Sequence, residues 1–423
     1  MTLRPSSIAS NDFLRSTGKP TWLESIARRA VIDRLGLIRH GQLTLIDGND
    51  QFQFGDANSD VRASVTVTDP RFFADVAFGG AVGGGEAFMR GYWQTDCLTN
   101  VVRIFARNRE TLNQMDSGVG RFMRPIRKLF HRLNENSRQG SRRNISAHYD
   151  LGNDFFECWL DRRMQYSSAI FPSKDTDLDE AQRTKLDRLC QKLALREDDH
   201  LLEIGSGWGG LAIYAAEQYG CRVTTTTISK EQFEFARQRV AEAGLEDRIE
   251  LLLCDYRDLD GSYDKLVSVE MLEAVGHKFH STYFRKCGEL LKPDGLMVLQ
   301  TITIADQRYE LAKRSVDFIQ RYIFPGGCLP SLTSITSTLI EHTDLRITHA
   351  EDIGPHYAET LRHWHERLFA QVDDILDMGY SHEFLRMWKY YLCYCEGGFL
   401  ERVIGNLQLV ATGPEHRQPV YLP

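Results

Sequence analysis

The sequence predicts a doubly wound α/β domain with a largely parallel sheet, preceded by a smaller α+β domain. In the second half of the chain, short β-rich segments alternate with helix-like stretches, which is typical of parallel strands joined by crossover helices. At 201–210 an apolar strand leads directly into a glycine-rich turn and then into an Ala-rich helix. A chain of 423 residues is also long for a single hydrophobic core, which favours two domains.

Composition places the chain among ordinary globular proteins. Charged residues make up 26% of it and hydrophobic residues 42%. It contains no apolar run of transmembrane length, no signal-peptide pattern at the N-terminus, and nine cysteines without metal-ligand spacing. These features predict a cytoplasmic protein with reduced thiols and no metal site. The net charge of −7 predicts no nucleic-acid partner.

The first part of the chain, residues 1–120, is expected to form an accessory domain. Apolar and polar residues alternate around 41–46 and 63–68, which predicts short strands. A glycine-rich passage at 78–89 then leads into helix-like sequence, and one interpretation of this passage is a loop that binds no ligand. No titratable cluster stands out here, so we expect a lipid-docking or binding module and not the reaction centre.

A basic segment, residues 121–143, separates the two parts. It holds eight Arg or Lys residues against one acid, Glu135, and its apolar residues recur every three to four positions. A basic amphipathic helix of this kind lies on anionic bilayer surfaces. The alternative is a solvated interdomain linker, because Gln139-Gly-Ser is typical linker sequence. Both interpretations remain open.

The remainder, 144–423, is expected to be the catalytic domain. Ligands of such folds bind beyond the carboxyl ends of the parallel strands. We expect the stretch between 304 and 351 to be largely helical and to cover the site. The β-rich segments are 201–205, 222–228, 249–254, 265–269 and 296–304, and helices are expected at 178–192 and 230–243. The strand-end candidates are Thr227, Ile228, Asp255, Tyr256, Glu270, Glu273, Gln300 and Ile302.

The glycine turn carries the most specific chemistry. Glu203 is followed by glycines at alternate positions, Gly205, Gly207 and Gly209. The dinucleotide-binding fingerprint differs, because its third glycine comes one residue later. A carboxylate before the turn suits a cationic or amine-bearing ligand, so the pattern indicates S-adenosylmethionine and not NAD. The alternative is an ordinary glycine turn of an α/β sheet.

Several further blocks, in order along the chain, resemble the cyclopropane-fatty-acid synthases. This family resembles class I methyltransferases, which have a Rossmann-like doubly wound sheet, and adds an N-terminal domain. The resemblance runs from about residue 68 to the end of the chain. Its blocks are 144–156, 164–171, 203–210, 254–259, 269–277, 322–331, 352–361, 390–399 and 405–410.

The resemblance implies an enzyme that transfers a methylene group from S-adenosylmethionine to a cis double bond of an unsaturated phospholipid acyl chain, forming a cyclopropane. A competing hypothesis is a fatty-acyl C-methyltransferase with a methyl-branched or methylene product. A third is a lipid-binding protein with an inactive methyltransferase domain, against which the intact motifs argue. The resemblance further implies peripheral contact with the inner membrane surface, membrane phospholipid as substrate, and a homodimer.

The resemblance also implies roles for individual residues. The base of the family is a bound bicarbonate, an anion that takes a proton from the newly added methyl group. Two positions depart from the best-known bacterial pattern, because cysteine is usual at Ser168 and histidine at Gln300. This Ser/Gln variant resembles the plant-type branch. Both residues can still hydrogen-bond an anion. The implied bicarbonate site is Ser168, Glu273, Gln300, Ile302 and Tyr357. The implied cofactor site is Tyr166, Ser167, Glu203, Gly205, Gly207, Thr227, Ile228, Gln232, Asp255 and Tyr256.

Overall fold

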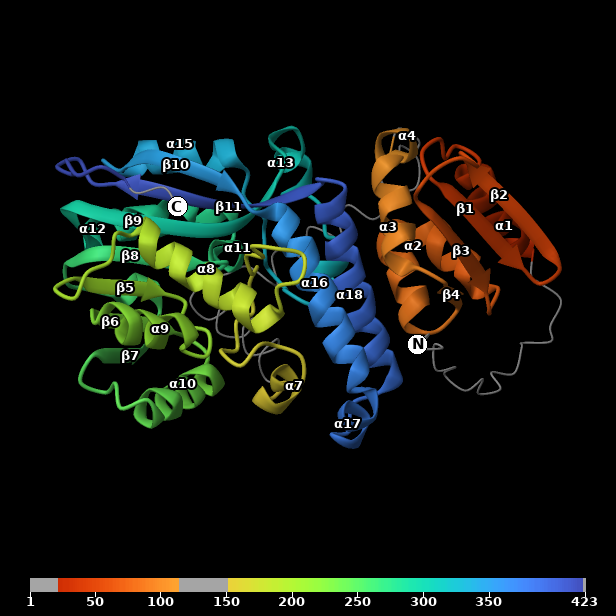
Figure 1. Ribbon diagram of the computed structural model, residues 1–423. Helices are drawn as coiled ribbons and strands as arrows, with labels where there is room; N and C mark the ends of the chain where they lie inside the picture. The colour runs from red at the N-terminus through yellow and green to blue at the C-terminus, as the bar shows by residue number, and fades with distance from the viewer. Residues whose placement is uncertain (1–21, 114–150, 421–423) are drawn as a thin grey trace.

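The structure, a computed structural model, describes residues 22–113 and 151–420. The basic segment 121–143 and the first residues of the block 144–156 lie outside the described residues. Figure 1 shows the seven-stranded sheet at one end of the molecule and the N-terminal elements at the other. Within the described ranges, no helix is both long and apolar enough to cross a bilayer.

The N-terminal part is an α+β unit, as expected. Its four-stranded sheet has the order β2-β1-β3-β4, with β1 parallel to β3 and antiparallel to β2. The strands predicted around 41–46 and 63–68 are confirmed as β1 and β3. The elements are α1 (Trp22–Leu35), β1 (Gln42–Asp47), β2 (Asp50–Gly55), β3 (Arg62–Val67), α2 (Arg71–Met89), β4 (Trp93–Thr95), α3 (Leu98–Arg107) and α4 (Arg109–Asn113).

The glycine-rich passage 78–89 is not a loop, so that interpretation was wrong. It lies inside α2, whose backbone leaves helical geometry only at Gly80, with φ of 58°. The glycines serve close packing. A Cβ at Gly85 would lie 2.6 Å from the ring of Phe318 in the catalytic part, whereas one at the neighbouring Gly84 would meet only Val76, at 3.9 Å.

The catalytic part is built on a seven-stranded sheet of order β10-β11-β9-β8-β5-β6-β7. Strands β5 to β9 run parallel, and β11 pairs antiparallel with both β9 and β10. The chain runs from β5 outward to β6 and β7 and then crosses back to β8 on the other side of β5, so the topological switch point lies at β5. The strands are β5 (His200–Ile204), β6 (Arg222–Thr227), β7 (Ile249–Leu253), β8 (Tyr263–Val269), β9 (Leu291–Ile304), β10 (Arg346–Asp352) and β11 (Ile404–Thr412).

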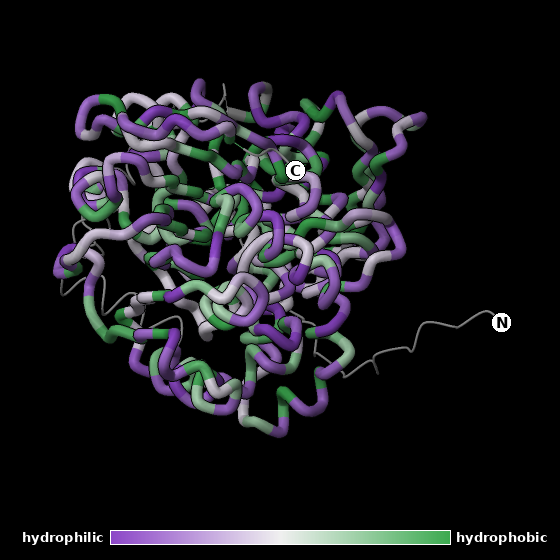
Figure 2. Tube along the Cα trace, turned by 60° about the vertical axis from the view of Figure 1, so that its left-hand side comes forward, coloured by the Kyte–Doolittle hydropathy of each residue, from purple (hydrophilic) through white to green (hydrophobic). Residues whose placement is uncertain are grey.

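Helices cover both faces of this sheet, which confirms the doubly wound fold. On one face α8 (Leu178–Lys192), α9 (Gly210–Tyr219) and α10 (Lys230–Glu242) enclose an apolar core. On the other face α12 (His280–Leu290) and α15 (Leu332–His342) enclose a second core. Figure 2 shows hydrophobic stretches running through the interior and hydrophilic ones on the outer turns.

Further helices, both short and long, complete this part of the chain. The stretch between 304 and 351 is largely helical, as predicted, and holds α13, α14 and α15 before β10 begins. The remaining elements are α7 (Asn153–Glu157), η2 (Tyr256–Asp258), α11 (Leu272–Val275), η3 (His277–Phe279), α13 (Asp306–Ala312), α14 (Phe318–Tyr322), α16 (Gly354–Ala370), α17 (Val372–Asp377) and α18 (His382–Leu400).

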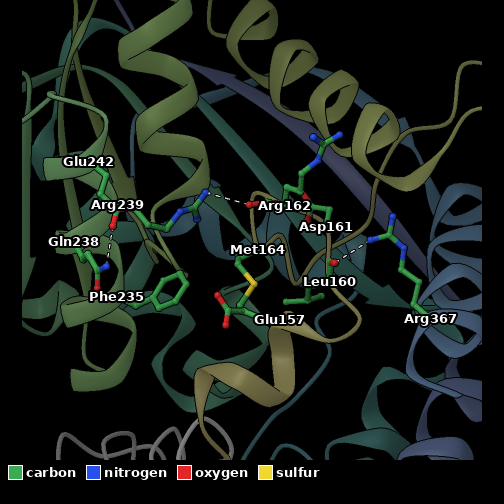
Figure 3. Close-up of a pocket in the computed structure, with 10 residues that line it drawn as sticks. All are labelled: Glu157, Leu160, Asp161, Arg162, Met164, Phe235, Gln238, Arg239, Glu242 and Arg367. Carbon is green, nitrogen blue, oxygen red and sulfur yellow. Dashed lines mark hydrogen bonds between the residues drawn. The ribbon is translucent and has the colours of Figure 1, made fainter. Parts of the chain in front are cut away.

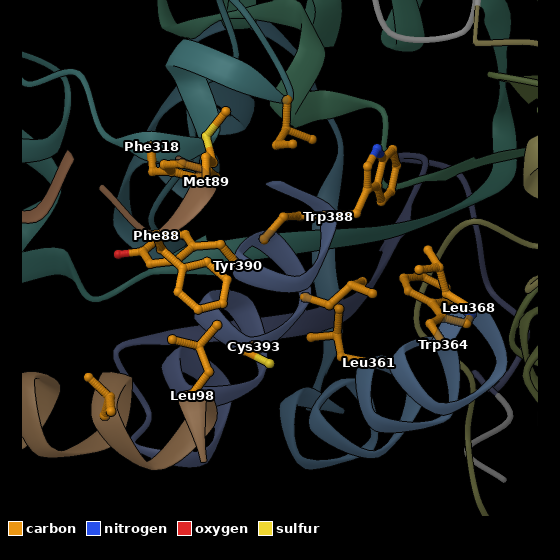
Figure 4. Close-up of a cluster of buried hydrophobic side chains, with 14 of the residues drawn as sticks. Phe88, Met89, Leu98, Phe318, Leu361, Trp364, Leu368, Trp388, Tyr390 and Cys393 are labelled. Atoms are coloured by element: carbon orange, nitrogen blue, oxygen red, sulfur yellow. The ribbon is translucent and has the colours of Figure 1, made fainter. Parts of the chain in front are cut away.

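A third core joins the two parts of the chain. Helices α16 and α18 pack against each other, and α18 also packs against α2 and α3 of the N-terminal part (Figure 1). Figure 4 shows Phe88 and Leu98 from the N-terminal part in one cluster with Phe318, Tyr390 and Trp388. Ion pairs reinforce the contact, because Glu401 at the end of α18 accepts from Arg103 at 2.7 Å and from Arg107 at 2.8 Å, both on α3.

We predict that Gly85→Ala destabilises the protein by about 1–3 kcal/mol, because the added methyl group overlaps Phe318 across the joint core. The matched control is Gly84→Ala in the same helix, which meets only an ordinary contact and should be neutral or stabilising by up to about 1 kcal/mol. Chemical unfolding of both variants measures the difference. Equal free energies of unfolding for the two variants would show that Gly85 of α2 does not pack tightly against Phe318 of α14.

Candidate active site

The glycine turn leaves exposed backbone beyond the end of β5. Gly205, Gly207 and Gly209 all have positive φ, at 101°, 50° and 83°, in the region that favours glycine. A Cβ at Gly207 would have no atom within 4 Å, so the turn is open on that side. An open, side-chain-free turn at the switch point fits the S-adenosylmethionine predicted for it.

Two buried ionisable side chains, Glu203 and Lys185, lie near this turn. Glu203 is buried and accepts from Thr225 Oγ1 at 2.5 Å, and burial raises the pKa of its carboxyl to about 8. Lys185 of α8 is also buried, and burial lowers the pKa of its ammonium. Its Nζ donates to Gln165 Oε1 and to Ser167 Oγ, both at 2.8 Å. The Ser167 hydroxyl, predicted to contact the cofactor, therefore accepts from this lysine.

The end of β6 brings a predicted pair together. Thr227 Oγ1 donates to Gln232 Oε1 at 3.0 Å, because Ser229 caps α10 and turns Gln232 back toward the strand. Ile228 follows Thr227 in the short segment that joins β6 to α10. The role of all three toward the cofactor stays a prediction.

Asp255 and Tyr256, which were predicted to contact the cofactor and lie just beyond β7, differ in their surroundings. Asp255 accepts from the Arg257 guanidinium at 2.8 Å, so its carboxylate is already engaged. Tyr256 packs edge-on against Tyr283, and its buried hydroxyl has no hydrogen-bond partner among the described residues. An orphaned buried hydroxyl near a ligand site is consistent with a group that completes its hydrogen bonding.

An aromatic wall, formed by Tyr166, Trp159, Trp364, Tyr357 and Phe399, adjoins the Glu270 carboxylate through Tyr357. The Tyr166 hydroxyl bonds that of Tyr391 at 3.0 Å, and the Tyr166 ring packs against Trp159 and Trp364. Tyr357 packs edge-on against Trp364 and stacks on Phe399, with centroids 4.5 Å apart. Aromatic faces carry negative potential, so they stabilise positive charge in a dry site.

Glu270 lies at the centre of the residues that were predicted to hold bicarbonate. It follows β8 directly, and its side chain is partly buried. Four groups from four different segments converge on its carboxylate. Oε1 accepts from Ser168 N at 3.0 Å, Gln300 Nε2 at 2.9 Å and Asn406 Nδ2 at 2.6 Å, and Oε2 accepts from Tyr357 OH at 2.8 Å.

The backbone of Glu270 is held in an unusual conformation. Its φ is 51°, in the left-handed region that glycine adopts freely but other residues avoid. Its N–H donates to the carbonyl of Gln300 at 2.7 Å, which fixes the turn. A conformation of this kind costs about 1 kcal/mol or more and persists at functional sites, where the surroundings enforce it.

Glu273, one helical turn further along, has a different environment. Its Oε1 accepts from Thr301 Oγ1 at 3.0 Å and from the backbone N–H of Ile302. Its Oε2 is buried and has no partner among the described residues. Burial, and to a lesser extent repulsion by Glu270, raises the pKa of this carboxyl to about 8, so it keeps its proton at neutral pH.

The predicted bicarbonate set is thus divided. Gln300 and Tyr357 donate to Glu270, and Ser168 does so with its backbone, while its hydroxyl donates to the Ala169 carbonyl. Glu273 pairs with Ile302 instead.

Reasoning from the sequence did not identify three contributors to the site, namely Glu270 as the hydrogen-bond acceptor, Asn406 and Lys185. Signals for two of them existed, because Glu270 was a strand-end candidate and Asn406 lies in the block 405–410 that carries the resemblance.

A surface pocket of about 390 Å³ lies between three parts of the chain, which are α10, the segment that follows α7, and α16 (Figure 3). Phe235 and Arg239 of α10 face Met164 and Glu157 across it. Arg239 and Arg367 donate to the backbone carbonyls of Arg162 and Leu160. None of the residues predicted for the cofactor or the base lines this pocket, and neither does Glu270.

We predict that Glu273→Gln stabilises the protein at alkaline pH. The folded protein keeps the Glu273 proton up to about pH 8, whereas the unfolded chain loses it near the usual 4.5. The folded state therefore binds more protons in this window, and its stability falls as pH rises. The variant, which retains the Oε1 contacts, should equal the parent near pH 4 and exceed it by about 1–3 kcal/mol at pH 8.

Urea unfolding at several pH values measures this difference. The exposed Glu246→Gln is the control and should follow the parent at every pH. A Glu273→Gln difference that does not change between pH 5 and pH 8 would contradict the buried, protonated state.

Comparison with known proteins agrees with this geometry. The family model described as mycolic acid cyclopropane synthetase matches residues 136–409. The chain is 42% identical over 348 residues to tuberculostearic acid methyltransferase UfaA1 of Mycobacterium tuberculosis, covering 79% of this chain and 80% of that protein. It is 39% identical over 359 residues to the cyclopropane-fatty-acyl-phospholipid synthase of Escherichia coli K12, covering 84% and 88%.

Solved structures share the fold of the catalytic part. Mycolic acid cyclopropane synthase CmaA1, complexed with SAH and CTAB, superposes with a TM-score of 0.60 at 32% identity, over 64% of this chain and 98% of that one. The glycine turn at the switch point and the buried site beyond β8 and β9 therefore belong to an S-adenosylmethionine-dependent methyltransferase. By the extent of the family match and of the similarity to these relatives, the chain belongs to the mycolic acid cyclopropane synthetase family.

Proposed function

We propose that this enzyme adds a methylene group from S-adenosylmethionine to a cis double bond of an unsaturated phospholipid acyl chain, forming a cyclopropane, and that Glu270 accepts the proton lost when the ring closes. The observation that carries the proposal is the Glu270 carboxylate, on which four hydrogen-bond donors converge beside an aromatic wall. The E. coli relative bears the name of this activity.

The residues around the glycine turn would hold the cofactor. Glu203 and the backbone at Gly205 and Gly207 would bind its amino-acid end, and the Thr227–Gln232 pair its ribose. S-adenosylmethionine supplies a methyl group on a positively charged sulfur, which an electron-rich carbon attacks. Lys185 holds the Ser167 segment against the sheet and thereby shapes this end of the site.

The alkene is a weak nucleophile, so the site must stabilise the positive charge that develops on the acyl chain. The faces of Tyr166, Tyr357 and Trp364 and the negative charge of Glu270 suit this task. The protonated Glu273 adds no second negative charge and offers no competing nucleophile.

Ring closure requires that the added carbon lose one proton. The new C–C bond would form with the electron pair of the original double bond as the sulfur–methyl bond breaks, the electron pair of that bond staying on the sulfur. A C–H bond of the added methyl group then breaks. Its electron pair closes the ring, and its proton passes to the Glu270 carboxylate and later to water. The donors around Glu270 hold its carboxylate in place, with three hydrogen bonds to Oε1 and one to Oε2.

Glu270 takes the place that the family resemblance gave to bicarbonate. Gln300, Tyr357 and the Ser168 backbone already donate to it, so these three donors are not available to a free anion. The proposed reaction therefore takes its proton acceptor from the chain itself, and no step of it requires bicarbonate.

A second candidate is methyl transfer without ring closure, which gives a methylene or an unsaturated methyl-branched product. It is favoured by the name of the relative at 42% identity, a tuberculostearic acid methyltransferase. The same cation and the same proton acceptor serve this reaction, because only the bond formed as the proton leaves differs.

We further propose that the enzyme works at the inner surface of the membrane, since its substrate chain is embedded in a bilayer. The basic segment 121–143, with a charge of +7 from eight cations and one acid, supports this proposal by its sequence. Each cation near an anionic surface contributes about 1 kcal/mol, so together they can outweigh the overall negative charge.

We predict that Glu270→Gly lowers turnover by about 10²-fold or more, the usual scale for loss of general-base assistance, and that added bicarbonate or formate restores part of it. Glycine suits the φ of 51° and leaves a space lined by the four donors, which a small carboxylate can enter. The control Glu270→Gln loses turnover equally but fills the space, so the same anions should not rescue it. Parent activity should not depend on bicarbonate.

Binding of S-adenosylhomocysteine, measured by calorimetry, should be unchanged in both variants. Near-normal turnover by Glu270→Gln, or parent activity that requires bicarbonate, would overturn the role of Glu270.

We predict that expression in a host without its own synthase yields phospholipid acyl chains heavier by about 14 Da that resist catalytic hydrogenation. That behaviour is expected of a ring, whereas a methylene or unsaturated methyl-branched chain takes up hydrogen. Lipid mass spectrometry before and after hydrogenation distinguishes the two. A heavier chain that takes up hydrogen would establish the second candidate, and unchanged lipids would refute both.

A further inference from the structure

We propose that Lys192 and Gln408 are positioning residues of the active site, which act through a directed row of hydrogen bonds that aims the Gln300 amide at Glu270. This inference rests on the proposed role of Glu270 as proton acceptor. Neither Lys192 nor Gln408 touches the acceptor itself.

The row crosses the sheet at one level. Gln408 of β11 is paired with Glu351 of β10 on one side and with Gln300 of β9 on the other. Gln300 is in turn paired with Val269 of β8, the residue before Glu270. Because residues at one level of neighbouring strands point to the same face, the side chains of Glu351, Gln408 and Gln300 form a row that leads to Glu270.

Each link in the row is a direct hydrogen bond between two side chains. Lys192 Nζ donates to Gln408 Oε1 at 2.6 Å, and Gln408 Nε2 donates to Gln300 Oε1 at 2.9 Å. Gln300 Nε2 then donates to Glu270 Oε1 at 2.9 Å. Lys192 also donates to Glu351 Oε2 at 2.5 Å, and Arg188 binds the other oxygen of that carboxylate at 2.6 Å.

The lysine determines the direction of the row. An ammonium group can only donate, so the Gln408 carbonyl must face Lys192 and its amide nitrogen must face Gln300. The Gln300 carbonyl must then face Gln408, which leaves its amide N–H groups for Glu270 and for the Ser168 carbonyl, at 2.9 and 3.4 Å. A glutamine side chain has no such preference by itself, because its two ends are nearly the same size.

Burial makes the arrangement effective. The Lys192, Gln408 and Gln300 side chains are all fully buried, so water cannot compete for their hydrogen bonds. In such a medium a reversed Gln300 would turn its carbonyl toward the Glu270 carboxylate, which would cost a donor and add repulsion. The ammonium also polarises both amides in the direction that strengthens the bond to Glu270.

The experiment compares two substitutions at Gln408. Gln408→Glu keeps the shape and the contact with Lys192 but has no donor for Gln300, so Gln300 must reverse. Gln408→Met also removes the donor but leaves Gln300 free to remain turned toward Glu270. We expect kcat to fall about tenfold or more in Gln408→Glu, and by clearly less in Gln408→Met, with the KM for S-adenosylmethionine unchanged in both.

A purely structural role predicts the opposite order, because Gln408→Glu preserves the Lys192 contact that Gln408→Met loses. Thermal unfolding and binding of S-adenosylhomocysteine establish that each variant is folded. An equal kcat in the parent and both folded variants, or a lower kcat in Gln408→Met than in Gln408→Glu, would overturn the proposal.

Lys192→Met provides an independent variant, should Gln408→Glu not fold. It removes the group that sets the direction, and kcat should fall severalfold at constant KM. Its matched control is Lys292→Met, which removes another lysine–carboxylate pair from the same sheet, with Asp264 at 2.5 Å, and should retain the parent kcat. Equal kcat for Lys192→Met and Lys292→Met would also overturn the proposal.

The role of Glu270 is tested separately by Glu270→Gln. If that variant is inactive while the Gln408 and Lys192 variants are unimpaired, only the positioning row is refuted. If Glu270→Gln is active, the proposed function itself fails.

Discussion

The active site depends on one interaction, the binding of the Glu270 carboxylate by donors from four separate segments. The segment before the sheet, β9, β11 and α16 each contribute one donor, so the carboxylate is held in place only when all four are assembled. This explains how a non-glycine residue tolerates a φ of 51° directly after a strand. The strain is offset by charge-assisted hydrogen bonds, which are about twice as strong as neutral ones.

Helix α8 supplies the cations that balance this buried negative charge. Lys185 and Lys192 are seven residues apart, so they lie two turns apart on the same, sheet-facing side of the helix. Lys185 donates to Gln165 and Ser167, and Lys192 to Glu351 and Gln408. A helix that buries two lysines against a sheet would be costly without acceptors for their ammonium groups, and here the acceptors lead to the two ends of the site.

The N-terminal part is joined to the site through shared packing. Glu86 of α2 accepts from the hydroxyl of Tyr322 at 2.7 Å, and Gly85 admits Phe318 of the same short helix, α14. Helix α14 lies in the stretch between β9 and β10, and α18 carries both Tyr391, which bonds Tyr166, and the surface that binds α3. The glycine-rich passage thus allows the two parts to approach closely, and its role is one of packing.

The sequence by itself determined the doubly wound sheet and the glycine turn after β5. These follow from local rules, because alternating strand and helix patterns place strand ends on one edge and alternate glycines make an open turn. The strand-end placement was less accurate, because Gln300 and Ile302 lie inside β9 and Glu273 lies in α11. The same local reasoning failed at 78–89, where glycines that suggest a loop form part of a helix, since what decides that passage is the close approach of Phe318.

Only the tertiary structure decided which carboxylate receives the donors. Glu270 and Glu273 both follow β8 and differ little in sequence context, yet one accepts from four groups and the other keeps a proton and an unpartnered oxygen. That difference comes from Asn406, Tyr357 and the row through Gln408 to Lys192, which lie far from Glu270 along the chain. Hydrogen bonding and desolvation depend on what surrounds a group in space, and only folding brings those surroundings together.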